Sequence, residues 1–426
     1  MLTAITGINW GDEGKGRMVD LLCREYDIVV RYQGGNNAGH TVVNSQGKFV
    51  LNLLPSGILH PQVVCVMGNG MVIDPAHLQR EITSLREKGV EINPQHLKIS
   101  DRATICMPYH VQQDDLEEKR LGDARFGSTL RGIAYVYGDK YMKKTLRMGD
   151  LLHMDAALKA RLATIVSWKS AELQGMYEAP ALDLEELWGQ LQNYAAIFAP
   201  YICDAGEYLA QADDEGKKIL FEAQLGALRD VDFGIYPYTT SSNVIGSYAP
   251  IGAGIPGRKL HDSIGVMKAY SSCVGEGPFT AEQAMTEQEK DRLREAGHEY
   301  GAATGRPRRV GPFDVVASRY GVACQGADAL ALTLLDVLDY MERVPVVTHY
   351  RVGGVQTDRF PMGGALDTAE PVVEYLPGWH CDLSGCRTWQ QLPKAAQEYV
   401  LYLEKAVGCR IQYISVGPDR DACIRR

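Results

Sequence analysis

Short runs of apolar residues alternate along the chain with longer stretches in which apolar residues recur at the helix period. The runs are continuously apolar, which is typical of strands buried on both faces of a sheet. They predict strands at residues 2–8, 28–32, 63–67, 219–221, 332–335 and 411–414. The longer stretches predict helices at 76–88, 182–209 and 393–407. The alternation predicts an α/β fold with a large, mostly parallel central sheet flanked by helices.

Glycines gather where the predicted strands end. They cluster at residues 7–16, 34–39, 68–70, 275–277 and 301–311, and Gly417 lies near the end of the chain. In a parallel α/β sheet, ligands bind beyond the carboxyl ends of the strands, where loops approach them closely. Because these loops come from all parts of the chain, we expect one composite site and a single interwoven domain over residues 1–426.

Composition and charge narrow the classes of protein. Hydrophobic residues make up 45% of the 426 residues and charged residues 23%, as in a globular protein with a sizeable core. The formal net charge of −9 argues against a broad nucleic-acid surface and against docking on an anionic membrane. No run approaches the roughly 18 apolar residues of a membrane span. A small anionic substrate is compatible with these numbers, since a local basic cluster can override a mildly acidic whole.

The ten cysteines are scattered along the chain, and residues 1–6 do not form a signal peptide. We therefore expect reduced thiols in a cytoplasmic protein. His380, Cys381 and Cys386 are close in sequence, but no second ligand pair stands at a known metal spacing. A metal site is not predicted there.

The first glycine-rich loop follows a predicted strand and leads into residues 17–23, which have helix character. Backbone N–H groups in such a turn can cradle phosphates, and Lys15 would add a charge on the outer phosphates. The Walker pattern is not met, because Asn9 stands at its first glycine and Gly16 replaces the Ser or Thr that holds Mg²⁺. Asp12 is then the candidate metal ligand. The alternative is a tight turn in which Asp12 and Glu13 only cap the helix.

The second loop, residues 31–41, reads R-Y-Q-G-G-N-N-A-G-H-T. Its glycines permit close backbone approach, and His40 can donate a proton or a hydrogen bond to developing charge. The alternative is that His40 is a structural histidine, as most single histidines are.

Residues 10–16 and 34–41 together resemble the two N-terminal signatures of the adenylosuccinate synthetase family. Similar segments follow in order at 54–59, 68–70, 236–243, 268–271, 304–306, 335–339 and 417–420. The resemblance therefore runs nearly from end to end. It implies an α/β fold like that of the P-loop NTPases, with helical and loop insertions around the central sheet.

The resemblance also implies a reaction. The family joins L-aspartate to IMP and drives the step with GTP hydrolysis. By resemblance, Asp12 takes the N1 proton of hypoxanthine while binding Mg²⁺ together with the carbonyl of Gly39. The O6 atom then attacks the γ-phosphate, with His40 and Lys15 stabilising the transferring group. The aspartate amine displaces the resulting 6-phosphoryl group.

Other roles carry over position by position from the resemblance. The predicted GTP residues are Gly11, Glu13, Gly14, Lys15, Gly16, Gly39, His40, Thr41, Asp336, Ser415 and Gly417. The predicted IMP residues are Asp12, Asn37, Thr129, Lys143, Gln224, Thr240 and Arg308. The predicted aspartate residues are Ala302, Ala303, Thr304, Gly305 and Arg306. By resemblance, Arg306 and Arg308 grip the dicarboxylate and nearby oxygens; the alternative is that both belong to a solvated basic loop. A homodimer is implied, with Lys143 reaching the active site of the partner subunit.

Several positions depart from the family pattern. The glutamine of the family's F-E-G-A-Q-G-T segment is displaced by one residue to Gln224, unless a local shift restores it. Lys143 stands where an arginine is usual, and Ala303 where a threonine is usual. Three hypotheses follow. The first is adenylosuccinate synthetase activity, the second a paralogue that uses another amine or purine nucleotide, and the third a GTP-binding regulator without turnover.

Overall fold

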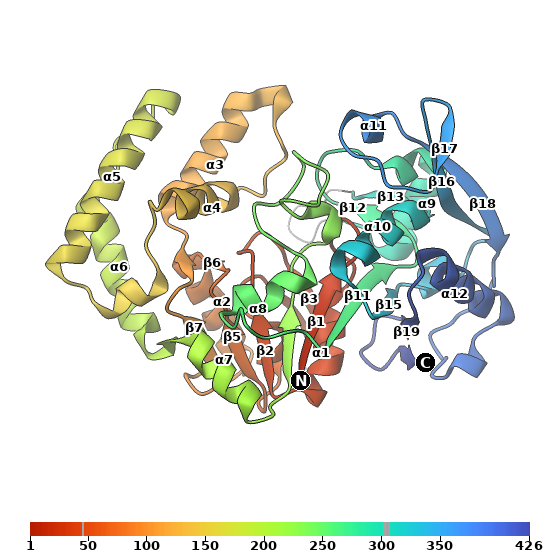
Figure 1. Ribbon diagram of the computed structural model, residues 1–426, viewed down its shortest axis with the longest axis horizontal. Coiled ribbons are helices and arrows are strands. Elements are labelled where there is room, and N and C mark those ends of the chain that lie inside the picture. Colours follow the sequence, from red (N-terminus) through yellow and green to blue (C-terminus); the bar gives the residue numbers. More distant parts are fainter. Residues whose placement is uncertain (45–46, 301–304, 306) are drawn as a thin grey trace.

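A ten-stranded sheet forms the centre of the molecule (Figure 1). The computed structural model describes residues 1–44, 47–300, 305 and 307–426. In spatial order the strands are β20 (Cys423–Arg425), β19 (Ile411–Ser415), β15 (Ala329–Thr333), β11 (Asp262–Lys268), β1 (Leu2–Gly7), β10 (Ile219–Glu222), β2 (Ile28–Arg31), β5 (Val64–Met67), β7 (Leu97–Ser100) and β9 (Ile202–Cys203). All neighbours pair in parallel except β19 and β20. This confirms the predicted α/β class.

The central strands are buried on both faces, which explains their continuous apolar runs. Ile5 of β1 packs with residues of α1 (Lys15–Leu22), whereas Leu2 and Ala4 pack with residues of α7 (Ala205–Asp214). Alternate residues of one strand therefore contribute to two different hydrophobic cores. All strands that pair in parallel end at the same edge, so the loops after β1, β2, β10 and β15 lie together.

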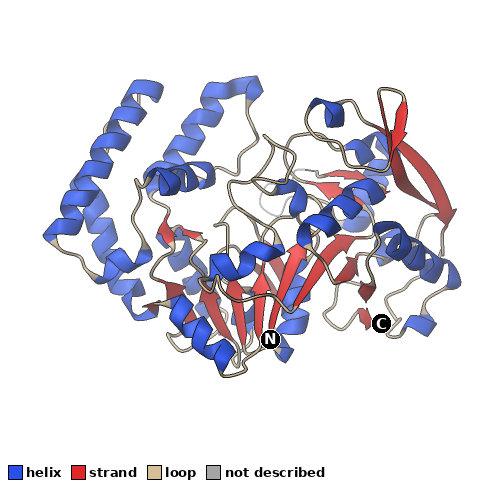
Figure 2. Cartoon of the chain, viewed as in Figure 1, coloured by secondary structure: helices blue, strands red, loops and turns tan. Residues whose placement is uncertain are grey.

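The remaining helices flank the sheet or form insertions beside it (Figures 1 and 2). Those near the sheet are α2 (Pro75–Glu87), α8 (Ala249–Ala253), α9 (Glu287–Gly297), α10 (Val315–Gln325) and α12 (Lys394–Val407), whereas the short α11 (Gly364–Asp367) lies apart from it at the top of Figure 1. A separate helical group, at the left of Figure 1, consists of α3 (Pro108–Leu121), α4 (Ile133–Met142), α5 (Ala156–Tyr177) and α6 (Leu184–Phe198). This group is the predicted helical insertion.

Smaller sheets border the central one. The largest joins β14 (Phe313–Asp314), β16 (Arg343–Val352), β17 (Val355–Thr357) and β18 (Glu370–Pro377). Two-stranded pairs are β3 (His40–Asn44) with β4 (Gly47–Leu51), β6 (Val72–Ile73) with β8 (Thr104–Ile105), and β12 (Ser271–Cys273) with β13 (Arg309–Gly311). In the described part of the chain, no helix is both long and apolar enough to cross a membrane. The single interwoven domain stays a prediction.

Two predicted boundaries were wrong. The helix expected over 182–209 is two helices, because Pro200 lies in a short 3-10 turn after α6 and the Asp204 side chain caps α7 by accepting from the N–H of Glu207 (2.9 Å). The strand expected at 332–335 is β15, which begins at Ala329 and ends at Thr333. Leu334 has a φ of 60°, which a strand cannot continue through.

Candidate active site

The first loop forms the connection between β1 and α1. Gly11 and Gly14 have φ values of 99° and 91°, and Gly14 is the residue before the first helical turn. Position 16 requires a glycine for a different reason. A Cβ there would lie 2.7 Å from the Cβ of His40. The first turn of α1 therefore packs directly on the start of β3. The structure brings the two predicted signature loops together.

Inside the first loop, the Glu13 carboxylate accepts hydrogen bonds from donors that could otherwise bind a phosphate. It accepts hydrogen bonds from the backbone N–H of Asn9 (3.1 Å) and Gly11 (2.8 Å), and from Lys15 Nζ (2.6 Å). Both Glu13 and Lys15 are buried. The two backbone bonds run back along the loop, and the third joins Glu13 to the Lys15 side chain and not to a backbone N–H of α1. Glu13 therefore acts as an internal anion for the loop and not as the helix cap of the alternative interpretation.

Asp12 has a φ of 65° and keeps a side chain that is 34% exposed. Arg308 Nη2 lies 2.7 Å from Asp12 Oδ2, and Arg308 Nη1 lies 2.9 Å from Glu299 Oε2. Glu299 is buried and also accepts from Lys268 Nζ (2.6 Å). Burial alone would raise the pKa of Glu299, but Lys268 and Arg308 hold that pKa below its usual range. The predicted IMP residues Asp12 and Arg308 therefore meet.

His40 is buried against Glu222, the last residue of β10. His40 Nδ1 lies 2.5 Å from Glu222 Oε1, and Glu222 also accepts from the N–H (2.7 Å) and hydroxyl (2.6 Å) of Ser56. Burial lowers the pKa of His40 in spite of this carboxylate. Burial opposes the charge on Glu222 as well, yet His40, Arg31 and Ser56 hold the pKa of Glu222 below its usual range. A neutral His40 that donates Nδ1–H to an ionised Glu222 fits both directions.

Gln224 and Leu225 face different loops. Gln224 is fully buried, and its Nε2 donates to the carbonyl of Gly35 (2.8 Å) in the second loop. Leu225 has a φ of 58° and lies against Gly11, whose added Cβ would be 3.2 Å from the Cα of Leu225. The Nε2 of Gln224 is thus engaged by the second loop, whereas its buried Oε1 has no hydrogen-bond partner among the described residues. An apolar side chain, that of Leu225, stands beside the first loop. The binding of IMP by Gln224 stays a prediction.

Asp336 lies in the loop after β15, where it begins the 3-10 helix η9 (Asp336–Leu338). Its Oδ1 has no hydrogen-bond partner among the described residues, and burial raises the pKa of Asp336. Arg17 of α1 donates to Ser415 Oγ and to the carbonyl of Asp419. Thr333 Oγ1 donates to the carbonyl of Glu13 (2.8 Å), which ties the end of β15 to the phosphate loop. These contacts draw Asp336 and Ser415 to the same side of α1.

Sequence reasoning missed several residues that build this site. Arg17 follows Gly16 directly, and its position one residue after a phosphate loop was the signal that could have identified it. Arg420 binds Asp20 of α1 through two nitrogens, both at 2.6 Å. This bidentate pair fastens the segment that contains Gly417 to α1. Glu222 and Glu299 carried no local sequence signal, because their partners lie far away in the chain.

Other predicted residues lie around this centre. Asn37 Oδ1 accepts from the N–H of Gly35 (3.3 Å), and the N–H of Thr240 donates to the carbonyl of Arg229 (2.8 Å). Thr41 and Thr129 are exposed. Lys143 is exposed at the end of α4, and its side chain makes no hydrogen bond or ion pair with the part of the chain that is described.

The predicted aspartate loop is mostly outside the described residues, which exclude Ala302, Ala303, Thr304 and Arg306. Gly305 is described, has a φ of 64° and is exposed. The binding of aspartate by this loop stays a prediction.

The predicted metal ligands are Asp12 and the carbonyl of Gly39. No group of three or more His, Cys, Asp or Glu side chains that could hold a metal occurs among the described residues, those near Cys381 and Cys386 included. Mg²⁺ is usually held by one or two protein carboxylates together with substrate phosphates. Asp12, partly exposed and paired with Arg308, fits this role.

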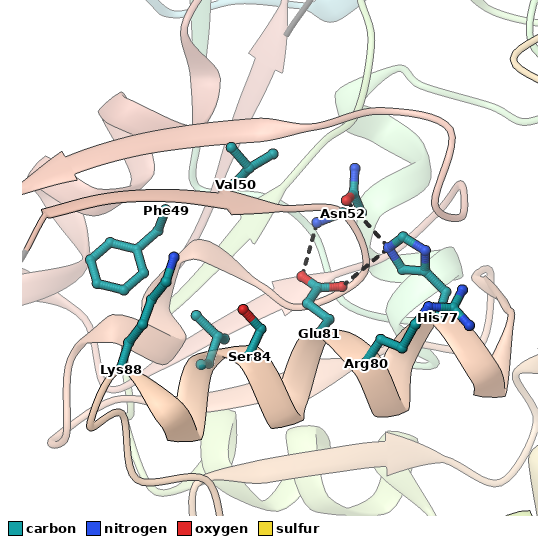
Figure 3. A pocket seen from close by; sticks show the side chains of 9 residues that line it. Phe49, Val50, Asn52, His77, Arg80, Glu81, Ser84 and Lys88 are labelled. Atoms are coloured by element: carbon teal, nitrogen blue, oxygen red, sulfur yellow. Dashed lines mark hydrogen bonds and ion pairs between the residues drawn. The ribbon is translucent and has the colours of Figure 1, made fainter. Parts of the chain in front are cut away.

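A pocket of about 220 Å³ lies between β4 and α2 (Figure 3). None of the predicted substrate residues lines it. Glu81 and His77 of α2 face Asn52 there, and Asn52 Nδ2 donates to the carbonyl of Ala38 (3.1 Å). The pocket therefore lies behind the segment that carries Gly39 and His40 and is not the candidate site.

Known proteins match the chain over its whole length. A family model described as adenylosuccinate synthetase matches residues 4–424. The adenylosuccinate synthetase of Caldanaerobacter subterraneus subsp. tengcongensis is 43% identical over 424 residues, which cover 99% of this chain and 98% of that protein. Adenylosuccinate synthetase 2 of Pseudoalteromonas translucida is 45% identical over 426 residues, 99% of each chain.

Solved structures agree. The fully ligated adenylosuccinate synthetase of Plasmodium falciparum superposes with a TM-score of 0.92 at 34% identity, covering 100% of this chain and 99% of that one. The succinoaminodeoxyadenylate synthetase of cyanophage S-2L, at 18% identity and a TM-score of 0.59, covers 100% of this chain and 95% of that one and shares the fold.

The fold and the site define a nucleotide-using α/β ligase, built on a phosphate loop at the carboxyl ends of parallel strands. The chain belongs to the adenylosuccinate synthetase family and is an enzyme. This confirms the resemblance seen in the two N-terminal signatures.

Proposed function

We propose that the protein catalyses the GTP-dependent joining of L-aspartate to IMP, giving adenylosuccinate, GDP and phosphate. One observation carries the proposal beyond family membership. Around the first turn of α1 the chain gathers a partly exposed carboxylate on Asp12, a buried cation on Lys15 and a buried imidazole on His40. A base, a phosphate-binding cation and a group that can stabilise a transferring phosphoryl are the parts that this reaction requires.

Two cations of the site are held by carboxylates that substrates can replace. Lys15 is paired with Glu13, and Arg308 is paired with Asp12. In the proposed reaction Lys15 turns from Glu13 to the outer phosphates of GTP. Arg308 turns from Asp12 to substrate oxygens, which frees Asp12 to accept the N1 proton of IMP. The deprotonated purine then attacks the γ-phosphate through O6, and the aspartate amine displaces the 6-phosphoryl group.

The metal expected here is Mg²⁺, with Asp12 and the Gly39 carbonyl as its protein ligands. When bound, it supplies charge neutralisation on the phosphate oxygens. His40 would stabilise the same transferring group from the opposite loop, supported by Glu222. On the base of GTP, the free Oδ1 of Asp336 would accept from the guanine N1–H and amine, and Ser415 and Gly417 would line the other edge.

The finer assignments also belong to the proposal. Asn37, Thr129 and Thr240 would bind IMP, and the loop of residues 302–306 would bind aspartate. The exposed position of Lys143 at the end of α4 is compatible with a homodimer in which it reaches the active site of the partner subunit. A cytoplasmic location is proposed on the family alone.

A paralogue with a changed purine nucleotide is the second candidate, favoured by the positions of Gln224 and Leu225. A turnover assay with purified protein, GTP, Mg²⁺, IMP and L-aspartate separates the two. Adenylosuccinate formation is expected. GTP hydrolysis that needs IMP but ignores aspartate would indicate another amine, and hydrolysis only with a different purine monophosphate would indicate another nucleotide. GTP binding without hydrolysis in any mixture would contradict both candidates.

A further inference from the structure

Arg31 is completely buried at the carboxyl end of β2. None of its three guanidinium nitrogens has a hydrogen-bond partner among the described residues. A buried cation without hydrogen bonds is unfavourable, so its presence in the sheet calls for a physical explanation. Its surroundings supply one.

Arg31 and Glu222 are register partners in the adjacent parallel strands β2 and β10. Side chains at one register position project from the same face of a sheet, so the guanidinium and the carboxylate lie over the same part of it. Burial lowers the pKa of Arg31, and the charges of Glu222 and Glu81 oppose that change. In return, Arg31 favours the ionised form of Glu222.

Glu81 supplies the second carboxylate. It is buried on α2, and its oxygens accept from the backbone N–H groups of Asn52 (2.9 Å), Leu53 (3.0 Å) and Leu54 (3.3 Å). Figure 3 shows Glu81 beside Asn52, at the point where the chain leaves β4. The two carboxylates that interact with Arg31 thus hold the two ends of the β3–β4 hairpin. Glu222 holds His40 at its start, and Glu81 holds residues 52–54 at its finish.

We propose that Arg31 is a positioning residue for His40 that acts through Glu222, an inference that rests on the proposed function. Arg31 keeps Glu222 charged inside the protein. The charged carboxylate accepts a hydrogen bond from the Nδ1–H of His40. The Nε2 atom is therefore the nitrogen that can contact the transferring phosphoryl group. Glu81 keeps the far end of the hairpin in place through its hydrogen bonds from the backbone N–H groups of residues 52–54.

The competing explanation is that Arg31 only fills space in the core. Buried charges are often replaced by apolar residues of similar volume with no loss of stability. In that case Arg31→Met would fold and turn over normally. Positioning through charge predicts instead that the effect of Arg31→Met depends on whether position 222 carries a charge.

A double-mutant cycle tests this difference. Arg31→Met and Glu222→Gln should each lower kcat about tenfold or more, the scale seen when the partner that orients a functional histidine is lost. The KM for GTP should change by less than about twofold. The double variant should be no worse than the poorer single variant, because a neutral residue 222 no longer needs the cation. Arg31→Lys, which keeps the charge, should recover most of kcat.

Lys169→Met is the matched control, since Lys169 is also a buried cation, paired with Asp139 at 2.8 Å in the helical insertion. It should alter thermal stability and leave kcat unchanged. Unchanged kcat in Arg31→Met, or losses that add in the double variant, would overturn the proposal. If Arg31→Met does not fold, the kcat of Arg31→Lys provides the test. A kcat of Arg31→Lys as low as that of Glu222→Gln would overturn the proposal.

A second measurement keeps this inference separate from the proposed reaction. The ¹⁵N spectrum of histidine-labelled protein without substrates reports the tautomer of His40. The Nδ1–H form is expected in the wild-type protein and a mixture in Arg31→Met. If the wild type makes no adenylosuccinate, the proposed function fails, while the tautomer still tests the positioning. An unchanged tautomer in Arg31→Met would refute it.

Discussion

Arg308 and Asp12 form an ion pair in which the guanidinium lies 2.7 Å from the carboxylate proposed as the catalytic base. Hydrogen bonds between a guanidinium and a carboxylate are charge-assisted and short. The same pair blocks that carboxylate until Arg308 moves to another partner. Glu299 holds the second nitrogen of Arg308 at 2.9 Å, so the guanidinium remains at the site when it leaves Asp12.

Asp12→Asn is expected to abolish turnover while nucleotide binding persists. The amide keeps the size of the side chain but cannot accept the N1 proton, and loss of a general base typically lowers kcat about 10²- to 10⁴-fold. The measurement is kcat for adenylosuccinate, together with GTP affinity from a fluorescent analogue. Asp115→Asn, at an exposed position that pairs with Lys119, is the control and should be neutral. Near-normal turnover in Asp12→Asn would remove Asp12 from the role of base.

Arg308→Lys is expected to raise the KM values for IMP and L-aspartate about tenfold or more. Lysine keeps the positive charge but loses the planar fork that serves Asp12 and Glu299 together. Steady-state kinetics with each substrate varied in turn provide the measurement, and the KM for GTP should change least. Arg319→Lys, whose exposed partner is Asp358, is the comparison variant. An equal rise in all three KM values would indicate a general distortion of the site instead.

The chain's local patterns predicted the central strands because those strands are apolar on both faces. β11 escaped prediction because it begins with Asp262 and Ser263 and contains Gly265, although its remaining residues are buried between β1 and β15. Its burial comes from neighbours that are distant in sequence. For the same reason periodicity could not divide 182–209 into α6 and α7, since apolar residues continue across the break.

The candidate site likewise contains residues that local sequence predicts and residues that it does not. Asp12, Lys15 and His40 lie in glycine-rich loops, and their approach around α1 follows from parallel strands that end at one edge. The carboxylates behind them could not be predicted. Glu222 meets His40 across 182 residues, and Arg308, which follows α9 in sequence, meets Asp12 of the first loop. Such pairings depend on tertiary geometry, which no local pattern reports.

Leu225→Gln is expected to lower the KM for IMP by about three- to tenfold, which corresponds to one added hydrogen bond. The reason is the different positions of the two side chains. Leu225 lies against Gly11, next to Asp12, whereas the Nε2 of Gln224 donates to the carbonyl of Gly35. KM values for IMP, measured at saturating GTP and aspartate, provide the test. Gln224→Leu is the companion variant and should reduce thermal stability, because it removes a buried hydrogen bond. A larger effect on the KM for IMP from Gln224→Leu than from Leu225→Gln would reverse the assignment.

Asp314 makes the folding stability depend on pH in a direction opposite to that of a salt-bridged carboxylate. It is fully buried at the start of α10, accepts from the N–H of Ala317 (2.9 Å) and the hydroxyl of Tyr350 (2.6 Å), and burial raises its pKa to about 6. The unfolded chain would titrate near 3.9. Between about pH 4 and pH 6 the folded protein therefore binds more protons than the unfolded chain, so this group stabilises the fold as the pH falls.

The shift amounts to about 3 kcal/mol in favour of the fold at the acid end of that window. Asp314→Asn keeps one acceptor oxygen for the N–H of Ala317, presents an amide donor to the Tyr350 hydroxyl oxygen, and cannot ionise, so its stability should lack this dependence. Urea unfolding of the wild type and the variant at pH 4.5 and pH 6.5 isolates the contribution, because all other groups cancel in the comparison. At the lower pH the free energy of unfolding of the wild type should rise relative to that of Asp314→Asn. Asp382→Asn, at an exposed position, is the control and should show the pH dependence of the wild type. Parallel pH profiles for the wild type and Asp314→Asn would mean that Asp314 is ionised in the folded protein throughout this range.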